Sequence, residues 1–149
     1  MSETSQHSFI NIALVQARDG VLNYFRPALS SAGLTEQQWR ILRLLAANGT
    51  MDFQDLSEQT SILRPSLTGV LTRLEQMGLL MRLKPASDQR RVFINLTEKG
   101  VKQYDQIAAQ MEAAYAALER DFGSNKLQKL NTLLRELSKL GEQYAQKKE

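Results

Sequence analysis

The sequence predicts an α+β fold that is mainly helical. Across most of the chain, apolar residues recur at steps of three or four, which is the spacing of an amphipathic helix. Residues 79–96 depart from this spacing, because two short strand-like runs there flank a polar, basic loop. A helical pattern that ends at Gly78 precedes them. A helix followed by a hairpin with a basic turn is the outline of a winged helix-turn-helix.

The first predicted helix covers residues 8–30. Further apolar residues widen its apolar stripe beyond what a single core contact needs, so we expect burial against a second chain. Pro27 should kink this helix or end it near Tyr24, because the proline ring clashes with the carbonyl four residues back. The stripe consists of Ile10, Leu14, Ala17, Val21, Phe25 and Ala28.

Two shorter helices follow. Thr35 is the predicted N-cap of the first, and Gln38 completes a capping box. Asp52 can cap the second, whose sequence is FQDLSEQT. Asp52, Asp55 and Glu58 lie at helical spacing and resemble a carboxylate site. Because no other ligand residue is near them, we interpret them as capping and solvated side chains.

A fourth helix is predicted from Pro65, a residue favoured at the first helical position, to Gly78. Its leucines and Val70 point to one side, and the opposite face is small, polar and basic. Gly69 on that face costs helix stability, about 1 kcal/mol relative to Ala, which makes sense if another backbone must come close. The exposed set consists of Arg64, Ser66, Thr68, Gly69, Thr72 and Arg73.

The strand-like runs LLMRLK and RVFINL come next, and the stretch PASDQR between them has the composition of a turn. Thr97 is the predicted N-cap of a fifth helix with a long apolar stripe. Gly123 breaks that stripe, and Ser124 can cap a sixth, leucine-rich helix.

Composition excludes several classes of function. The chain has no cysteine, which rules out disulfides, a thiolate metal site and a cysteine nucleophile. One histidine, His7, argues against a zinc site and a Ser-His-Asp triad. We therefore expect no enzymatic activity, no metal and no cofactor. No run of eighteen apolar residues and no signal peptide are present, which predicts a cytoplasmic protein without a membrane partner.

The net charge of +3 is unevenly distributed. Residues 1–60 hold four Arg against six acidic residues, whereas residues 61–102 hold eight Lys and Arg against three. The excess of positive charge therefore lies on the predicted fourth helix and hairpin. Such a surface suits nucleic-acid phosphates, and the alternative is a basic face that is merely solvated.

In a helix-turn-helix, the fourth helix would lie in the major groove. Arg64 is placed for a guanine contact or, failing that, a phosphate. Ser66, Thr68 and Thr72 can bond to phosphates or bases, and Arg73 to phosphate. Pro65 and Gly69 belong to the same candidate surface. The alternative is an ordinary amphipathic helix whose outer face is wet.

The hairpin loop carries three further candidates. Asp88 and Arg90 are two residues apart, so Asp88 could orient the guanidinium by a charge-assisted hydrogen bond. An arginine held in this way suits the narrow minor groove. Arg91 lies where the strand begins and would meet the DNA backbone. The alternative for the pair is a surface salt bridge worth about 0–1 kcal/mol.

The chain resembles the MarR family of bacterial transcriptional regulators. The resemblance is carried by GLTEQQWRILRLL, LRPSLTGVLTRLEQMGLLMR, the DQRR loop and the LTEKG that follows, and it spans nearly the whole chain. It implies a homodimer in which residues 8–34 and 98–147 form dimerisation helices and residues 35–97 form the DNA-binding lobe. Two lobes would face successive major grooves about 34 Å apart and read a pseudo-palindromic operator.

The resemblance also implies a small aromatic or phenolic acid, such as a hydroxyphenylacetate, that binds between the helices and the lobe and releases the DNA. The expected function is thus a ligand-responsive transcriptional repressor. The alternative is a non-specific architectural DNA-binding protein without an effector response.

An aromatic acid needs a cation for its carboxylate and apolar or aromatic walls. The candidates are Arg18 in the first helix, Trp39 and Arg40 in the second, and His7 before the first. Three of them have a plainer interpretation. Arg18 can pair with an acidic residue across the dimer, Trp39 can belong to the core, and His7 can be solvated.

Overall fold

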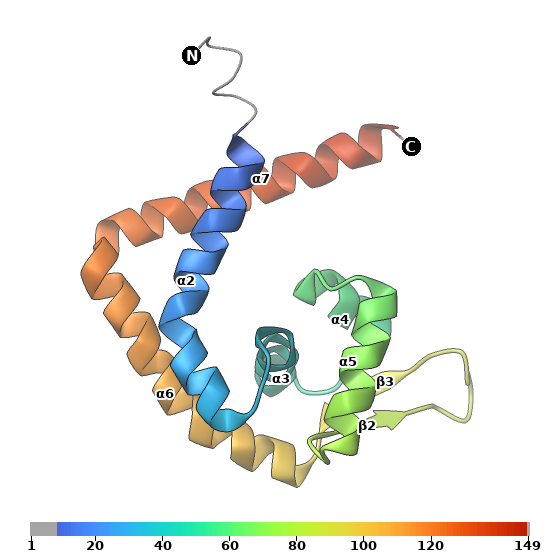
Figure 1. Ribbon diagram of the computed structural model, residues 1–149. Helices are drawn as coiled ribbons and strands as arrows, with labels where there is room; N and C mark the ends of the chain where they lie inside the picture. Colours follow the sequence, from blue (N-terminus) through green and yellow to red (C-terminus); the bar gives the residue numbers. More distant parts are fainter. Residues whose placement is uncertain (1–8, 149) are drawn as a thin grey trace.

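The computed structural model describes residues 9–148, which form six helices and one three-stranded sheet (Figure 1). The predicted mainly helical α+β class is confirmed. The elements, in chain order, are α2 (Ile10–Ala32), α3 (Glu36–Asn48), β1 (Met51–Asp52), α4 (Phe53–Thr60), α5 (Arg64–Gln76), β2 (Leu80–Leu83), β3 (Phe93–Leu96), α6 (Glu98–Phe122) and α7 (Ser124–Lys148).

Two parts are distinct in Figure 1. Helix α2 packs along α6, and α7 continues at a sharp angle from the far end of α6. On the other side, α3, α4, α5 and the sheet form what we call the lobe, from which the loop between β2 and β3 projects. No helix within residues 9–148 combines the length and hydrophobicity needed to cross a membrane.

Local capping fixes where the helices begin. Thr35 accepts a hydrogen bond from the amide of Gln38, whose side chain accepts one from the amide of Thr35, so the predicted capping box is confirmed. Asp52 caps α4 and Thr97 caps α6, as predicted. These caps satisfy amide groups that have no partner inside a helix.

The sheet has the order β1-β3-β2, and all its pairs are antiparallel. Strands β2 and β3 pair from Leu80 opposite Leu96 to Leu83 opposite Phe93. The sequence reading missed β1, where Met51 lies opposite Ile94. A strand of two residues has no alternating pattern, so only its pairing partner reveals it.

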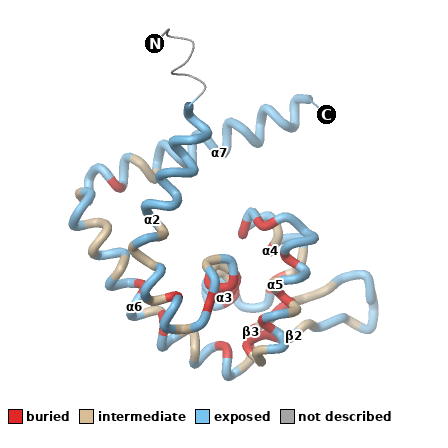
Figure 2. Tube along the Cα trace, viewed as in Figure 1, coloured by how far each residue is buried: buried red, intermediate tan, exposed pale blue. Residues whose placement is uncertain are grey.

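Most of the hydrophobic core lies in the lobe. Leucines from three helices are completely buried there, whereas the N-terminal half of α2 and nearly all of α7 are exposed (Figure 2). The largest fully buried side chains of the lobe include Ile41, Leu42, Leu56, Leu67, Leu71, Leu74 and Ile94.

Three sequence-based boundaries were wrong. Helix α2 does not end near Tyr24 but continues through Pro27 to Ala32, because packing against α6 outweighs the one missing hydrogen bond. Helix α5 begins at Arg64, one residue before Pro65. Ser124 is the first residue of α7, and its hydroxyl donates to the Glu119 carboxylate.

Candidate nucleic-acid interface and ligand cavity

Helix α5 presents two different faces. Leu67, Leu71 and Leu74 are completely buried in the lobe. On the opposite side, the predicted DNA-facing residues are exposed, except that Thr72 is half-buried. The structure thus brings most of these side chains onto one accessible surface, which consists of Arg64, Pro65, Ser66, Thr68, Gly69, Thr72 and Arg73.

The turn between α4 and α5 is held by hydrogen bonds within the lobe. The Thr60 hydroxyl donates to the carbonyl of Leu56 and accepts from the amide of Ile62. Ser61 has φ of 57°, the left-handed conformation. The Ser57 hydroxyl donates to the carbonyl of Ile62. The hydroxyls of Ser57 and Thr60 at the end of α4 are therefore occupied internally.

Internal contacts also constrain three candidates on α5. The guanidinium of Arg64 lies 5.4 Å from the centre of the Phe53 ring. This cation–π contact restrains the Arg64 side chain. The Thr68 hydroxyl donates to the carbonyl of Arg64, and the Thr72 hydroxyl donates to the carbonyl of Thr68. In this arrangement both hydroxyls retain only acceptor capacity for a DNA group.

Arg82 on β2 was not predicted as part of this surface. Its guanidinium donates to the Thr72 hydroxyl, and its Nε lies 3.7 Å from a carboxylate oxygen of Glu75. It therefore ties the hairpin to α5. Because the partners are ten and seven residues away in sequence, only the folded strand brings them together.

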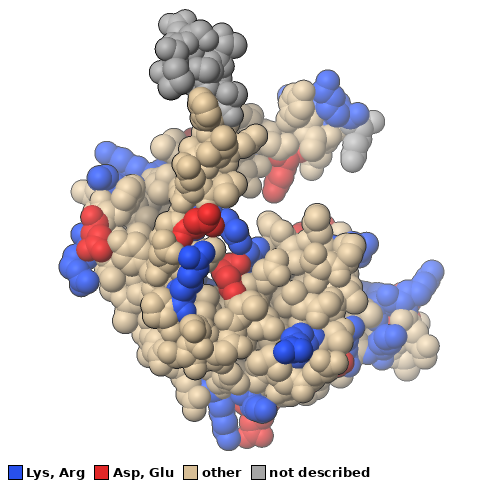
Figure 3. Space-filling model, viewed as in Figure 1, with Lys and Arg blue, Asp and Glu red and all other residues tan. Residues whose placement is uncertain are grey.

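The loop between β2 and β3 carries the predicted ion pair. The Asp88 carboxylate accepts hydrogen bonds from the backbone amide and from Nε of Arg90, at 3.1 and 3.3 Å. The Arg90 side chain is nonetheless 94% exposed. Basic side chains gather where this loop projects, at the right edge in Figure 3. The loop thus holds a guanidinium by one edge and offers the rest to solvent.

Arg91 has a different position from Arg90. Its guanidinium lies 3.3 Å from a carboxylate oxygen of Asp52 and 4.7 Å from the centre of the Phe93 ring. The capping residue of α4 thus also anchors the base of the hairpin. Only 21% of the Asp52 side chain is exposed, so this pair is better shielded from solvent than the Asp88–Arg90 pair.

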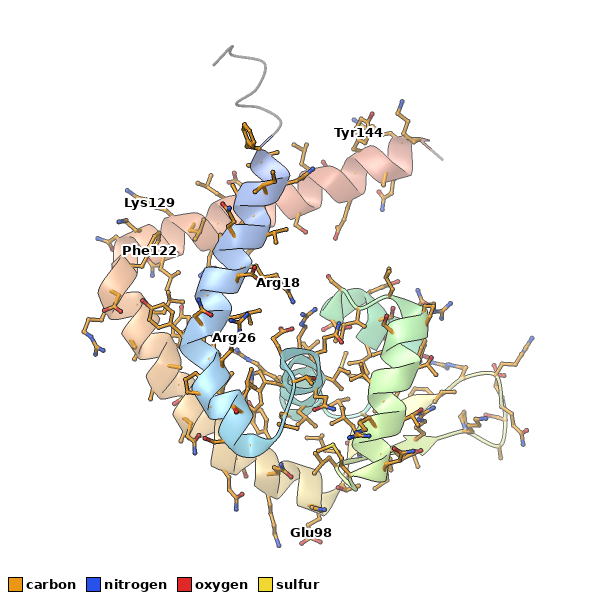
Figure 4. All side chains as sticks on the ribbon, in the orientation of Figure 1. Arg18, Arg26, Glu98, Phe122, Lys129 and Tyr144 are labelled. Carbon is orange, nitrogen blue, oxygen red and sulfur yellow. The ribbon has the colours of Figure 1, made fainter. Side chains whose placement is uncertain are left out.

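Of the predicted ligand residues, Arg18 and Arg40 share one carboxylate. Arg40 donates from Nε and Nη2 to the two oxygens of Glu36 and from Nη1 to the carbonyl of Thr60. Arg18 points from α2 towards the lobe in Figure 4, and its Nη2 lies 3.6 Å from Glu36. An acidic partner for Arg18 is thus present in its own chain, and a salt bridge across the dimer stays a prediction. His7 lies outside the described residues.

Trp39 belongs to both the core and a cavity. It is 6% exposed, and its ring stacks on that of Tyr104 with centroids 5.1 Å apart. The cavity beside it, about 370 Å³ in volume, lies between α2, α3 and α6. Its lining residues are Phe25, Trp39, Arg43, Tyr104, Ala108, Met111, Glu112 and Tyr115.

The cation of this cavity is Arg43, which the sequence reading missed. Arg18 and Arg40 do not line the cavity. Arg43 lies one helical turn after Trp39 on α3, so spacing could have placed it on the same face. Aromatic walls, one guanidinium and one carboxylate can hold an aromatic ligand with a charged and a polar end. Among residues 9–148, no three acidic or histidine side chains converge to hold a metal ion.

Comparison with known proteins gives concordant matches. Residues 34–92 match the model of the MarR family. The chain is 54% identical over 140 residues to the HTH-type transcriptional regulator FarR of Neisseria gonorrhoeae, covering 94% of this chain and 96% of that protein. It is 50% identical over 135 residues to the homoprotocatechuate degradative operon repressor of Escherichia coli, covering 91% of both.

A solved structure is also similar to this chain in sequence and fold. The crystal structure of NadR in complex with 4-hydroxyphenylacetate matches at 56% identity with a TM-score of 0.75. The match covers 87% of this chain and 92% of that one.

Proposed function

This chain belongs to the MarR family of transcriptional regulators, and we propose that it represses an operon for aromatic catabolism in the cytoplasm. In this proposal it binds operator DNA as a homodimer, and a small aromatic acid releases it. It is a regulator and not an enzyme.

One observation supports DNA binding above the others. Two basic features, the exposed face of α5 and the loop between β2 and β3, lie on the same lobe. Helix α5 offers a polar face with no bulky side chain, and the loop beside it extends Arg90 while Asp88 restrains it. We assign the α5 residues to the major groove and its phosphates, Arg90 to the minor groove, and Arg91 to the DNA backbone. Two lobes spaced about 34 Å apart would read two half-sites of a pseudo-palindrome.

The exposed apolar side chains of α2 and α7 support the dimer. Residues such as Ile10, Val15, Leu133 and Leu140 are 56 to 64% exposed on helices with helical apolar spacing. We therefore assign residues 8–34 and 98–147 to the dimerisation layer and residues 35–97 to the DNA-binding lobe. Burial of these side chains between two chains would supply most of the association free energy.

The cavity beside Trp39 is the proposed effector site. Its volume lies in the range of small-molecule pockets, and its walls are aromatic. We assign the effector carboxylate to Arg43 and an effector hydroxyl, as donor, to Glu112. The names of the Escherichia coli relative and of the NadR complex, which point to hydroxylated phenylacetates, support this class of ligand.

Operator binding tests the first half of the proposal. Arg90→Ala should weaken binding about tenfold and flatten the salt dependence, whose slope changes by roughly 0.9 for each phosphate that the protein no longer neutralises. Fluorescence anisotropy titrations at several salt concentrations measure both. Lys129→Ala, on α7 and far from the lobe, is the matched control. Unchanged affinity and slope for Arg90→Ala would remove the loop from the mechanism.

Competition separates the proposal from a non-specific architectural protein. A regulator should prefer its operator over random-sequence duplex by roughly 10³-fold or more. An architectural protein would bind both equally and would show no effector response.

Thermal shift tests the effector site. At about 100 times its dissociation constant, 4-hydroxyphenylacetate should stabilise the protein by about 2.7 kcal/mol. Arg43→Ala should lose most of this stabilisation, because the carboxylate would have no counter-charge, whereas Arg18→Ala should retain it. The reverse pattern would move the ligand to Arg18, and equal stabilisation of all three proteins would exclude both arginines.

A further inference from the structure

Leu63, the residue that immediately precedes α5, is exposed to an unusual extent. Its relative exposure is 78%, the highest value among the large apolar side chains of residues 9–148. The next highest, Tyr144 at 65% and Leu140 at 64%, lie on α7, where a second chain would cover them. Leu63 belongs to the lobe, so the dimer does not account for it.

Of the three helices of the lobe, α5 alone begins without a side-chain cap, a lack that it shares with α2, whose N-cap residue is Phe9. Thr35, Asp52 and Thr97 each accept a backbone hydrogen bond as N-cap residues. Leu63 is the N-cap of α5 and makes no such bond. Leucine is among the poorest N-cap residues, so Leu63 lowers the stability of α5. Its exposed side chain also leaves apolar surface in contact with water. Breaches of local rules of this kind cluster at functional sites.

The backbone around Leu63 is fixed, which prevents its side chain from turning into the core. Its carbonyl accepts a hydrogen bond of 2.8 Å from the amide of Leu67. Ile62 on one side is buried and held by Ser57 and Thr60, and Leu67 is completely buried. Ile62 and Leu67 thus fill the core on either side of Leu63. The backbone hydrogen bonds hold Leu63 at the start of the helix with its side chain in solvent.

We propose that Leu63 contacts the C5-methyl group of a thymine in the major groove. This inference rests on the proposed function, in which the start of α5 reaches the base edges. The thymine methyl is the apolar group that the major groove offers, and contact with a leucine removes both from water. Because Leu63 and Arg64 are consecutive and both exposed, we place this thymine in the same half-site as the base that Arg64 meets.

Deoxyuridine substitution tests the contact, since it removes only the methyl group. The preferred duplex is first selected from a random library, and each thymine is then replaced in turn. For the wild type, replacing the contacted thymine in one half-site should lower the affinity about fourfold, and replacing it in both should lower the affinity about fifteenfold. Leu63→Ala should bind the thymine and deoxyuridine duplexes equally. A penalty that persists in Leu63→Ala, or no penalty at any thymine in the wild type, overturns the inference.

Two further variants keep the test independent of folding. Leu63→Ser introduces a capping hydroxyl, so the melting temperature of this variant should equal or exceed that of the wild type. The loss of affinity on deoxyuridine substitution, which we call the methyl penalty, should disappear. Leu83→Ala removes an exposed leucine on β2 and should keep the penalty. Loss of the penalty in Leu83→Ala would overturn the assignment to Leu63.

The two proposals fail in different ways. If no duplex is preferred over random sequence, the proposed function fails and the inference fails with it. If a duplex is preferred but shows no methyl penalty that depends on Leu63, only the inference fails.

Discussion

The lobe and α7 use leucine at the same helical spacing with opposite results. In α5, Leu67, Leu71 and Leu74 are completely buried by the sheet and the neighbouring helices. Helix α7 is nearly twice as long but buries only Leu127, and Leu133, for example, is 61% exposed. Both sequence patterns predict an apolar helix face. Only the fold shows whether that face is buried within one chain.

The two parts of the molecule therefore differ in where their apolar side chains can be buried. Most of the buried core lies in the lobe, and Leu29, Ile107 and Met111 of α2 and α6 complete it, so the candidate DNA-contacting side chains of α5 are held in place within one chain. In the proposed dimer a second chain covers the apolar face of α7, so the distance between two lobes would be a property of the dimer. The cavity between α2, α3 and α6, which is the proposed effector site, lies where the two parts meet.

The largest expected effect comes from breaking the junction of the two parts at Gly100. A Cβ atom there would lie 2.0 Å from the carbonyl oxygen of Leu79 in the lobe. Gly100→Ala should therefore destabilise the protein by about 3 kcal/mol or more, against the roughly 1 kcal/mol that alanine gains in a helix. Urea unfolding measures the change. Gly69→Ala, where a Cβ meets open space, should stabilise α5.

A smaller effect on folding, but a large one on DNA binding, is expected from a charge on α7. Leu137→Glu places a carboxylate in the proposed dimer interface, so the dimer should dissociate while the lobe stays folded. Operator affinity should then fall about 100-fold or more through loss of avidity. Analytical ultracentrifugation and anisotropy measure the two changes. Lys139→Glu is the control, and a dimeric Leu137→Glu would refute the assignment of α7.

The smallest effect concerns the packing of α2 on α6. The Tyr24 hydroxyl donates to an Asp121 carboxylate oxygen at 2.8 Å, and this hydrogen bond raises the pKa of Tyr24 above 10.0. The hydrogen bond therefore stabilises the fold below about pH 10, and this stabilisation disappears as the pH rises through the raised value. Tyr24→Phe should melt slightly below the wild type at about pH 7, and the gap should close at high pH. Tyr144→Phe is the control, and a gap independent of pH would contradict this account.

Several features of the site could be predicted because they are local. The capping box of Thr35 and Gln38 spans three residues, and the pair of Asp88 and Arg90 spans two. Interactions of this range depend on backbone conformation that the intervening residues set. Predictions failed where distant contacts decide: of the two effects expected of Pro27, a kink or a helix end near Tyr24, the helix end is wrong, because α2 continues to Ala32 against α6.

The sequence by itself therefore determined the order of the helices and of the two hairpin strands, the caps at Thr35, Asp52 and Thr97, and the identity of the basic loop. Only the tertiary structure decided which side chains are left for ligands. It engaged Arg40 with the carbonyl of Thr60, formed the cavity beside Arg43, and paired Arg91 with Asp52, which is 39 residues away. It also left Leu63 outside the core that holds its neighbours. Burial and charge pairing depend on which segments meet, and a sequence pattern does not specify that.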